Sequence, residues 1–258
     1  MRRRDFMKTP LTIAGAAMLG KAGMMTLLSS SGTAHAAQPR APSLRRKVVS
    51  AFDKEYFYLE SPDDERVPSL TPDEDTAAKP YQTEVLPSGE KPLIFYNGVL
   101  ELCLESGQMP MDPPPDVLFD GDNLVVRERI AKKLEDMNIP NLAIQPAIYK
   151  DHKKKWHEDY WFLTFTKTFD CWDREKSRYN PKPRITNGVK EHLVYTFMLN
   201  GELLQKTPLR ERLLFKMGGS RLSPIFAHKS IVDLFRMRGV NVISVAEKAK
   251  EDGILEGE

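Results

Sequence analysis

The chain has 258 residues, of which 41% are hydrophobic and 29% charged, and its formal net charge is +2. This length and apolar content suit one large domain or two small ones with a buried core, and they exclude a wholly disordered or fibrous chain. The near balance of charge argues against a dedicated nucleic-acid-binding protein, which is normally strongly basic. Two cysteines exclude a disulfide framework and a zinc site built from cysteines alone.

The first 36 residues have the three parts of a secretory signal peptide: a basic head, an apolar stretch and an A-x-A cleavage pattern at Ala34 and Ala36. The head resembles a twin-arginine export signal. The residues that carry this likeness are Arg3, Arg4, Phe6 and Lys8. We therefore predict cleavage after Ala36 and export to the periplasm by the twin-arginine machinery. Retention of the apolar stretch as a membrane anchor is the alternative, although its many alanines and glycines make it weakly hydrophobic for a permanent span.

Removal of residues 1–36 takes away five basic residues and one acidic residue, which lowers the formal net charge from +2 to −2. The mature surface is then slightly acidic, and we expect no nucleic-acid partner and no stable membrane span after cleavage. The oxidising periplasm would permit a bridge between Cys103 and Cys171. Two buried free thiols are the alternative, because cysteine packs well in apolar, strand-like sequence.

Residues 37–92 form a segment rich in proline, charge and turn-forming residues, which we separate from a main domain at 93–258. Within the segment, the aromatic run 56–59 predicts an edge strand. Residues 61–80 predict an exposed loop or linker.

The main domain begins with two β-prone runs around Asn97-Gly98, which predict a hairpin over 93–104. The prolines in 109–116 then require a non-helical connection.

Two later stretches share one order of elements: strand, turn, strand, helix and strand. The first covers 117–144, and its helix at 127–138 has one apolar stripe. The second covers 213–245, and its helix at 228–238 ends at Gly239, a residue suited to a left-handed C-cap. The repetition predicts an internal duplication. The predicted fold class is α+β, with mixed sheets and two similar strand-turn-strand-helix-strand units.

Between the two units, residues 156–169 predict one long strand with aromatic side chains on both faces. A charged segment follows at 170–179, and after a loop rich in Pro, Lys and Asn another strand is predicted at 192–199.

The two units, the segment Tyr160-Trp161-Phe162-Leu163 and the segment after it resemble a bacterial immunity-protein family, whose members neutralise the toxins of polymorphic toxin systems. In that family a strand ends in an Asp-Cys-x-Asp-x-x-x-Ser-like segment. The residues that match it here are Asp170, Cys171, Asp173 and Ser177. The resemblance covers 93–245 and implies a non-enzymatic protein that binds a cognate toxin and needs no cofactor. The export signal departs from a family that looks mostly cytoplasmic, and it implies a toxin that acts in the periplasm or cell envelope.

The carboxylates of Asp170, Asp173 and Glu175 could in principle serve acid–base chemistry or hold a metal ion. Polar side chains at turns mostly form local hydrogen bonds, so we expect Asp170 and Ser177 to brace the turn.

His152 and His157 flank three lysines, but a spacing of five does not stack two imidazoles on a helix face. We therefore predict no metal site. The run from Lys150 to Lys155 could touch an acidic partner or a nucleic acid, but for a mature chain of net charge −2 we predict a solvated hairpin tip.

Aromatic residues in strands are commonly core residues, but exposed tryptophan and tyrosine are frequent binding hot spots. The residues predicted to bind the partner are Trp156, Tyr160, Trp161, Asp170, Trp172, Asp173, Glu175 and Ser177. Two alternative functions remain open at this stage. The chain could be an exported enzyme or cofactor-binding protein that folds before twin-arginine export, or a structural envelope protein tethered by residues 37–92.

Overall fold

The structure is a computed structural model, and it describes residues 49–186 and 188–254, which belong to one compact unit. None of the helices in these ranges is long and apolar enough to cross a membrane. The predicted signal and cleavage residues lie outside the described residues, so export and cleavage stay predictions. They are Arg3, Arg4, Phe6, Lys8, Ala34 and Ala36.

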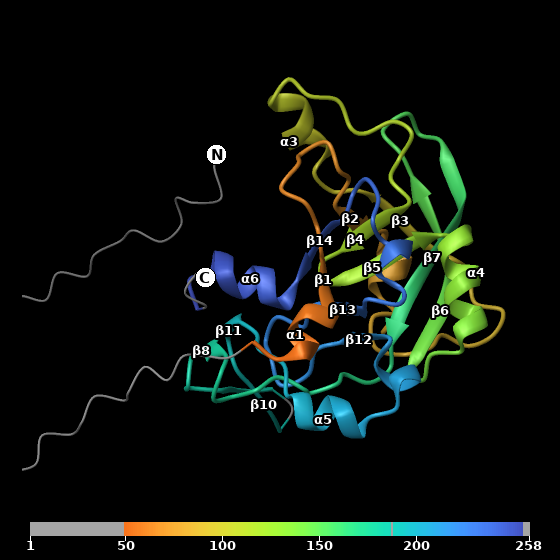
Figure 1. The fold of residues 1–258 in the computed structure, drawn as a ribbon. Helices are drawn as coiled ribbons and strands as arrows, with labels where there is room; N and C mark the ends of the chain where they lie inside the picture. The colour runs from red at the N-terminus through yellow and green to blue at the C-terminus, as the bar shows by residue number, and fades with distance from the viewer. Residues whose placement is uncertain (1–48, 187, 255–258) are drawn as a thin grey trace, which may run out of the picture. The chain divides into compact units, whose positions relative to one another are not determined.

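The larger of the two main sheets has six strands and curls until its first and last strands approach each other (Figure 1). Its strands, in spatial order, are β2 (Leu70–Pro72), β3 (Leu93–Asn97), β6 (Leu142–Lys150), β7 (Trp156–Phe165), β5 (Asn123–Arg127) and β4 (Val117–Asp120). A bridge between Ser69 and Phe119 links the two ends of this order, so the sheet is nearly closed. β3 and β6 run parallel, and the other neighbours are antiparallel.

The smaller main sheet is antiparallel and has four strands. In spatial order they are β12 (Leu214–Lys216), β13 (Ile225–His228), β1 (Tyr56–Glu60) and β14 (Asn241–Ser244). β1 is therefore a central strand, and the prediction of an edge strand at 56–59 is wrong. Its side chains alternate between two cores, with Tyr56 and Tyr58 on one face and Phe57 and Leu59 on the other.

The remaining elements are short. Two-stranded ribbons pair β8 (Arg178–Tyr179) with β11 (Val194–Thr196) and β9 (Arg184–Thr186) with β10 (Val189–Glu191). The α-helices of the described ranges are α1 (Ala51–Glu55), α2 (Glu74–Ala77), α3 (Leu100–Glu105), α4 (Glu128–Met137), α5 (Gly201–Lys206) and α6 (Val245–Glu251). The strand predicted at 192–199 is reduced to β11, and the long strand predicted at 156–169 is confirmed over β7.

The three largest apolar cores of the described residues lie inside the larger sheet, between the two sheets, and on the far side of the smaller sheet. Neighbouring residues on one strand serve different cores, because successive side chains point to opposite faces. On β7, Phe162 lies inside the larger sheet and Leu163 lies between the sheets. The far core contains Trp172 and Phe226.

α4 confirms the helix predicted at 127–138 to within one residue at each end. Its stripe of Ile130, Ala131 and Leu134 is buried between the two sheets. Asn138 ends the helix in a left-handed conformation, with φ of 47°. A side chain of this kind tolerates that conformation at a helix C-terminus.

The hairpin predicted at 93–104 is wrong in its second half, because Leu100–Glu105 forms α3. Gly98 has a role other than forming a hairpin turn. A Cβ at Gly98 would lie 2.0 Å from the Thr71 Oγ1, and the Gly98 N–H donates to the Ser69 carbonyl at 2.8 Å. The glycine therefore permits a close approach to the β2 segment rather than a hairpin turn.

The two predicted units share a strand topology. In the first, β7 lies between β5 and β6, and β4 is the outer neighbour of β5. In the second, β1 lies in the same way between β13 and β14, with β12 outside β13. The internal duplication itself stays a prediction, and this shared order is consistent with it.

The helix predicted at 228–238 is wrong: only a 3₁₀ turn forms, at Val232–Leu234. His228 instead pairs with Tyr56 in β13, and its Nδ1 accepts the Ser230 N–H at 3.2 Å, which turns the chain before a helix can begin. The apolar residues of the segment still reach the core between the sheets, so the periodicity identified the buried side chains but not the backbone.

The segment 61–80 is not the simple exposed linker that its composition predicts. It contains β2 and α2, and Leu70 and Thr76 are buried. The Thr76 Oγ1 accepts the N–H of Ile94 at 2.9 Å, which joins this segment to β3. The residues before 93 are thus part of both main sheets.

Candidate partner-binding surface

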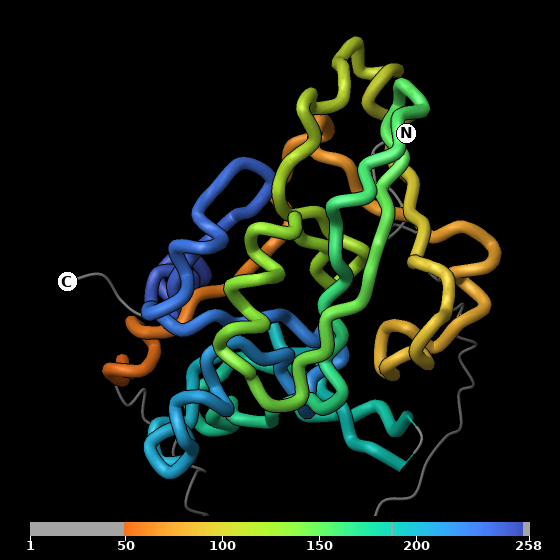
Figure 2. The backbone as a smooth tube through the Cα atoms, turned by 90° about the vertical axis from the view of Figure 1, so that its right-hand side faces the viewer, coloured from red at the N-terminus to blue at the C-terminus, as the bar shows by residue number. Residues whose placement is uncertain are grey.

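The β6–β7 hairpin projects beyond the rest of the larger sheet and carries Trp156 near its outer end (Figure 2). The Trp156 side chain is 46% exposed. The Nζ of Lys150 lies 4.8 Å from the centroid of the Trp156 ring and 5.7 Å from that of Tyr96. Attraction between a cation and the two ring faces orders all three side chains at the surface. We call Tyr96, Lys150 and Trp156 the aromatic–lysine cluster.

A β-bulge decides which side chains of β7 reach solvent. The register between β6 and β7 shifts so that Glu158 and Asp159 together lie opposite Ile148. His157 and Tyr160, on either side of the bulge, are both buried, while the two carboxylates between them are exposed. The bulge re-aims side chains in the way common at functional strands.

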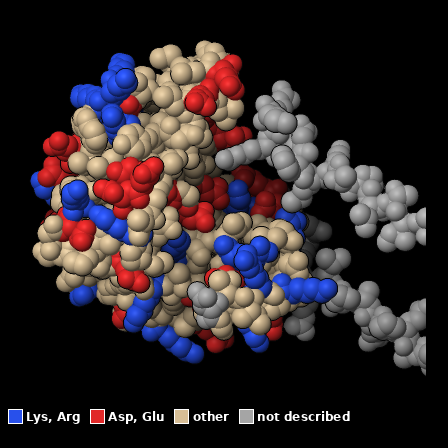
Figure 3. All heavy atoms as spheres, turned by 180° about the vertical axis from the view of Figure 1, so that it is seen from behind, with Lys and Arg blue, Asp and Glu red and all other residues tan. Residues whose placement is uncertain are grey.

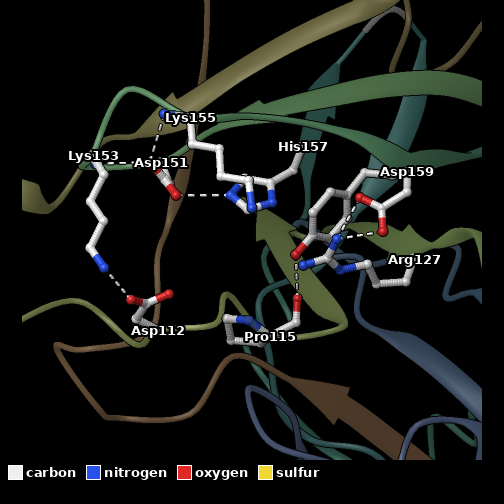
Figure 4. A network of polar contacts seen from close by, with 9 residues as sticks. Asp112, Pro115, Arg127, Asp151, Lys153, Lys155, His157 and Asp159 are labelled. Atoms are coloured by element: carbon white, nitrogen blue, oxygen red, sulfur yellow. Dashed lines mark hydrogen bonds and ion pairs between the residues drawn. The ribbon is translucent and has the colours of Figure 1, made fainter.

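Arg127, at the end of β5, connects the bulge to the interior (Figure 4). It forms an ion pair with Asp159, and its guanidinium carbon lies 4.2 Å from the centroid of the Tyr160 ring. The Tyr160 hydroxyl donates to the Pro115 carbonyl at 2.5 Å. Burial raises the pKa of Tyr160, so the phenol remains a neutral donor. These contacts fix Asp159 at the surface above a buried aromatic ring.

The hairpin tip is held from within by His157. Its Nε2 forms a hydrogen bond with Asp151 Oδ2 at 2.8 Å, and Asp151 Oδ1 accepts the N–H groups of Lys153 (2.8 Å) and Lys155 (2.9 Å). Burial acts to raise the pKa of Asp151, but these hydrogen bonds outweigh it and hold the pKa below the usual 3.8. His157 thus orders the tip, and the tip lysines are exposed as predicted. Lys153 also pairs with Asp112.

A shallow hollow of about 470 Å³ lies beside the bulge. Its lining includes Arg127, Glu128, Lys155, Trp156, Asp159 and Trp161. Two tryptophans among charged side chains are the composition of a protein-binding surface, where aromatic anchors are surrounded by a polar rim. Within the described ranges, no three His, Cys, Asp or Glu side chains converge as a metal site requires.

The segment 170–177 behaves differently, because its polar groups bind the chain's own backbone. Asp173 Oδ1 accepts the N–H groups of Glu175 (2.9 Å) and Lys176 (3.1 Å). Ser177 Oγ accepts the Met198 N–H at 2.9 Å and donates to the Met198 carbonyl at 3.3 Å. Ser177 braces the turn as predicted, Asp170 accepts a hydrogen bond from the Arg174 side chain within it, and Asp173 binds its backbone N–H groups.

Asp170 pairs with Arg174 at 2.6 Å, and the Arg174 guanidinium carbon lies 3.9 Å from the centroid of the Trp172 ring. This pair packs against Gly219, where a Cβ would lie 2.6 Å from Asp170 Oδ2 and φ is +66°. The Gly218-Gly219 pair is therefore a close backbone approach to the turn. Cys171 is a buried free thiol, as is Cys103.

The structure divides the residues predicted to bind the partner into three groups. Trp156, Asp170 and Glu175 are exposed, and Trp161 and Asp173 are partly buried. Tyr160, Trp172 and Ser177 have exposed fractions of 0%, 1% and 6%, so a partner cannot reach these three in the folded chain, which corrects the prediction for them. The two stretches also do not form one surface, because β7 is part of the larger sheet and Trp172 packs in the far core.

Two residues of the aromatic–lysine cluster, Tyr96 and Lys150, were not predicted from sequence. They meet because β3 and β6 pair in parallel with Tyr96 opposite Lys150. No local sequence pattern predicts a parallel pairing between strands so far apart in the chain.

A comparison with curated proteins found no match. The immunity protein family (Imm11) matches residues 58–233, which is more than half of the chain and runs from within β1 to the 3₁₀ turn before β14. This chain belongs to the Imm11 immunity protein family.

Proposed function

We propose that the chain neutralises a cognate bacterial toxin by binding it directly, with the aromatic–lysine cluster at the centre of the contact. Membership of an immunity protein family supports toxin neutralisation. The observation that carries the choice of surface is Trp156, a large side chain that is 46% exposed yet held in place by Lys150. An ordered tryptophan gives contact area at small entropic cost.

The contact needs no chemical step by this chain. The tryptophan would insert into an apolar recess of the toxin, and the carboxylates of the bulge would meet basic groups around it. Covering the active site of the toxin, or blocking its assembly, is sufficient for neutralisation. Charged residues at the rim then set the association rate and reject wrong partners.

We also propose that the chain works in the periplasm after twin-arginine export. The support is the sequence pattern of residues 1–36. The cognate toxin would then act in the periplasm or on the cell envelope. Replacing Arg3 and Arg4 together by lysine should leave the chain in the cytoplasm. The proposal is wrong if cell fractionation finds this double variant in the periplasm as abundantly as the natural chain.

The direct test is the affinity for the toxin encoded beside the gene of this chain. Trp156→Ala should raise the Kd about 30-fold or more, because truncating a hot-spot residue costs about 2 kcal/mol or more of binding. Tyr195→Ala is the matched control, since Tyr195 is 52% exposed but lies on β11. Titration calorimetry gives the Kd, and survival of toxin-producing cells gives protection.

Failure of the natural chain to bind or protect would overturn the proposed function. Equal losses for Trp156→Ala and Tyr195→Ala would retain toxin binding but reject the aromatic–lysine cluster as its centre.

A further inference from the structure

α3 projects from the same end of the molecule as the β6–β7 hairpin (Figures 1 and 2). Only Cys103, among the six residues of this helix, is buried. Leu102 and Leu104 flank Cys103 on the two sides of the helix, with exposed fractions of 43% and 49%, and Met109 in the following loop is 59% exposed. Three large apolar side chains are thus exposed within eight residues, on a helix and a loop at one end of the molecule.

The apolar patch has an acidic surround. Glu101 and Glu105 lie one helical turn apart on the exposed face, between the two leucines. The loop before β2 adds Asp63, Asp64 and Glu65, against a single Arg66 that pairs with Asp64 at 2.7 Å. In the described parts of the chain, the other four carboxylates form no ion pair. We call Leu102, Leu104, Met109 and these carboxylates the α3 patch.

The loop and the helix form one surface. The Met111 N–H donates to the Arg66 carbonyl at 2.8 Å, which joins the loop to the chain after α3. A hollow of about 780 Å³ lies between them, lined by Asp63, Asp64, Glu65, Arg66, Gln108 and Met109. Burial, followed by the nearby charges of Glu65 and Asp64, raises the pKa of the Cys103 thiol. The carboxylates of the loop therefore lie near the base of the helix.

The sequence of α3 is unfavourable for the stability of an isolated helix. Glu101 and Glu105 repel each other at a spacing of four. Glu105 stands at the C-terminal end, where the helix dipole favours a cation, and the last turn contains no basic residue. Val99 gives no side-chain hydrogen bond to the N-terminus. A basic partner would relieve both the repulsion and the unfavourable dipole interaction.

From these contacts we infer that the α3 patch is a second docking surface for the cognate toxin, and that it receives a toxin segment in which lysine or arginine residues alternate with apolar ones. The inference rests on the proposed function and names the chemistry of the partner. Apolar side chains of the segment cover Leu102, Leu104 and Met109. Its cations lie against the carboxylates of α3 and of the loop before β2.

The surroundings of the patch support a cationic occupant. Around α3 five carboxylates accompany the single Arg66, whereas acidic and basic side chains are interspersed over the face drawn in Figure 3. A toxin that spans both surfaces would present basic groups to the carboxylates of the bulge and to those of the α3 patch. The ion pair between Lys153 and Asp112 links the hairpin tip to the loop after α3.

The experiment compares two pairs of double variants by binding kinetics with the toxin encoded beside this gene. Leu102→Ala with Leu104→Ala should raise the Kd at least tenfold, mainly through faster dissociation. The control is Leu209→Ala with Leu222→Ala, whose side chains are 42% and 53% exposed, and it should change the Kd less than twofold.

The second pair tests charge. Glu101→Gln with Glu105→Gln should slow association several-fold at low salt and weaken the dependence of the association rate on salt. Glu202→Gln with Glu211→Gln, two exposed residues outside the patch, should leave both quantities unchanged.

The outcomes separate this inference from the proposed function. If the variants of the α3 patch bind as the natural chain does while Trp156→Ala loses binding, the inference is wrong and the proposed function stands. If the natural chain neither binds nor protects, the proposed function fails and the inference fails with it. Loss of binding in both patch variants, with both controls unchanged, supports the inference.

Discussion

Trp156 and Trp172 belong to two stretches that look equally suited to a partner in the sequence, and the structure gives them opposite roles. Trp156 is 46% exposed and is ordered by a lysine, whereas Trp172 is 1% exposed and packs edge-on against Tyr179 with ring centroids 4.9 Å apart. Around Trp156, Glu158 and Asp159 face solvent, while Asp151 and His157 are buried and hold the hairpin tip. Around Trp172 the side chains of Asp173 and Ser177 bind the backbone of their own turn. The fold uses charged groups beside both tryptophans, so the exposure of the tryptophan itself separates the anchor from the core residue.

The comparison predicts its largest effect at Trp172. Trp172→Ala should lower the free energy of unfolding by about 3–5 kcal/mol, because it leaves a large cavity in the far core. Trp156→Ala should change it by about 0.5 kcal/mol or less, the usual range for a surface substitution. Urea unfolding followed by far-ultraviolet circular dichroism measures both. Equal unfolding midpoints for the two variants would remove the distinction between anchor and core residue.

A smaller effect is expected at Ser177, where the hydroxyl both accepts from and donates to the backbone of Met198. Ser177→Ala leaves the buried Met198 N–H without this acceptor, which should cost about 1–3 kcal/mol of stability. The exposed Glu175 provides the control, and Glu175→Ala should stay within about 0.5 kcal/mol of the natural chain. Toxin affinity of folded Ser177→Ala should be unchanged. A large loss of toxin affinity in Ser177→Ala without a loss of stability would mean that the turn at 170–177 is part of the binding surface.

The sequence predicts best where the signal is local. The stripe of Ile130, Ala131 and Leu134 located α4, and the strand–turn–strand pattern located β4 and β5. The mixed α+β class also follows from these short-range patterns, whereas the immunity family was identified by the resemblance of residues 93–245 to its members. Within each stretch, the period of the apolar residues and the turn residues agree, so the backbone has one consistent solution.

The errors arise where long-range pairing decides the structure. The sequence predicts an edge strand at β1 because the neighbours of β1, strands β13 and β14, come more than 160 residues later in the chain. The second expected helix is lost because His228 remains paired in β13. The bulge at Glu158 and Asp159 depends on the register with β6, so exposure along β7 does not follow simple alternation. Burial of Tyr160 and Trp172 is set in the same way, by elements remote in sequence.

The smallest predicted effect on stability concerns Asp151 in the β6–β7 hairpin. Its charge orders the tip that carries Trp156. Hydrogen bonds hold the folded-state pKa of Asp151 below 3.8, so its ionised form stabilises the folded chain above that pH. This stabilisation is lost as pH falls through 3.8 toward the folded-state pKa. Asp151→Asn should therefore cost about 1 kcal/mol at pH 7 and progressively less below pH 3.8.

Urea unfolding of the natural chain and of Asp151→Asn at a series of pH values from neutral to acid measures this difference. The control is Asp63→Asn at an exposed carboxylate, which should change stability little at any pH. A difference between Asp151→Asn and the natural chain that stays constant into acid would mean that shape, not charge, orders the tip. The expected convergence at low pH would instead tie the exposed tryptophan to the ionised, buried carboxylate of Asp151. Trp156 and Trp172 would then both depend on hydrogen bonds made inside the protein. They would differ in whether the tryptophan itself is exposed.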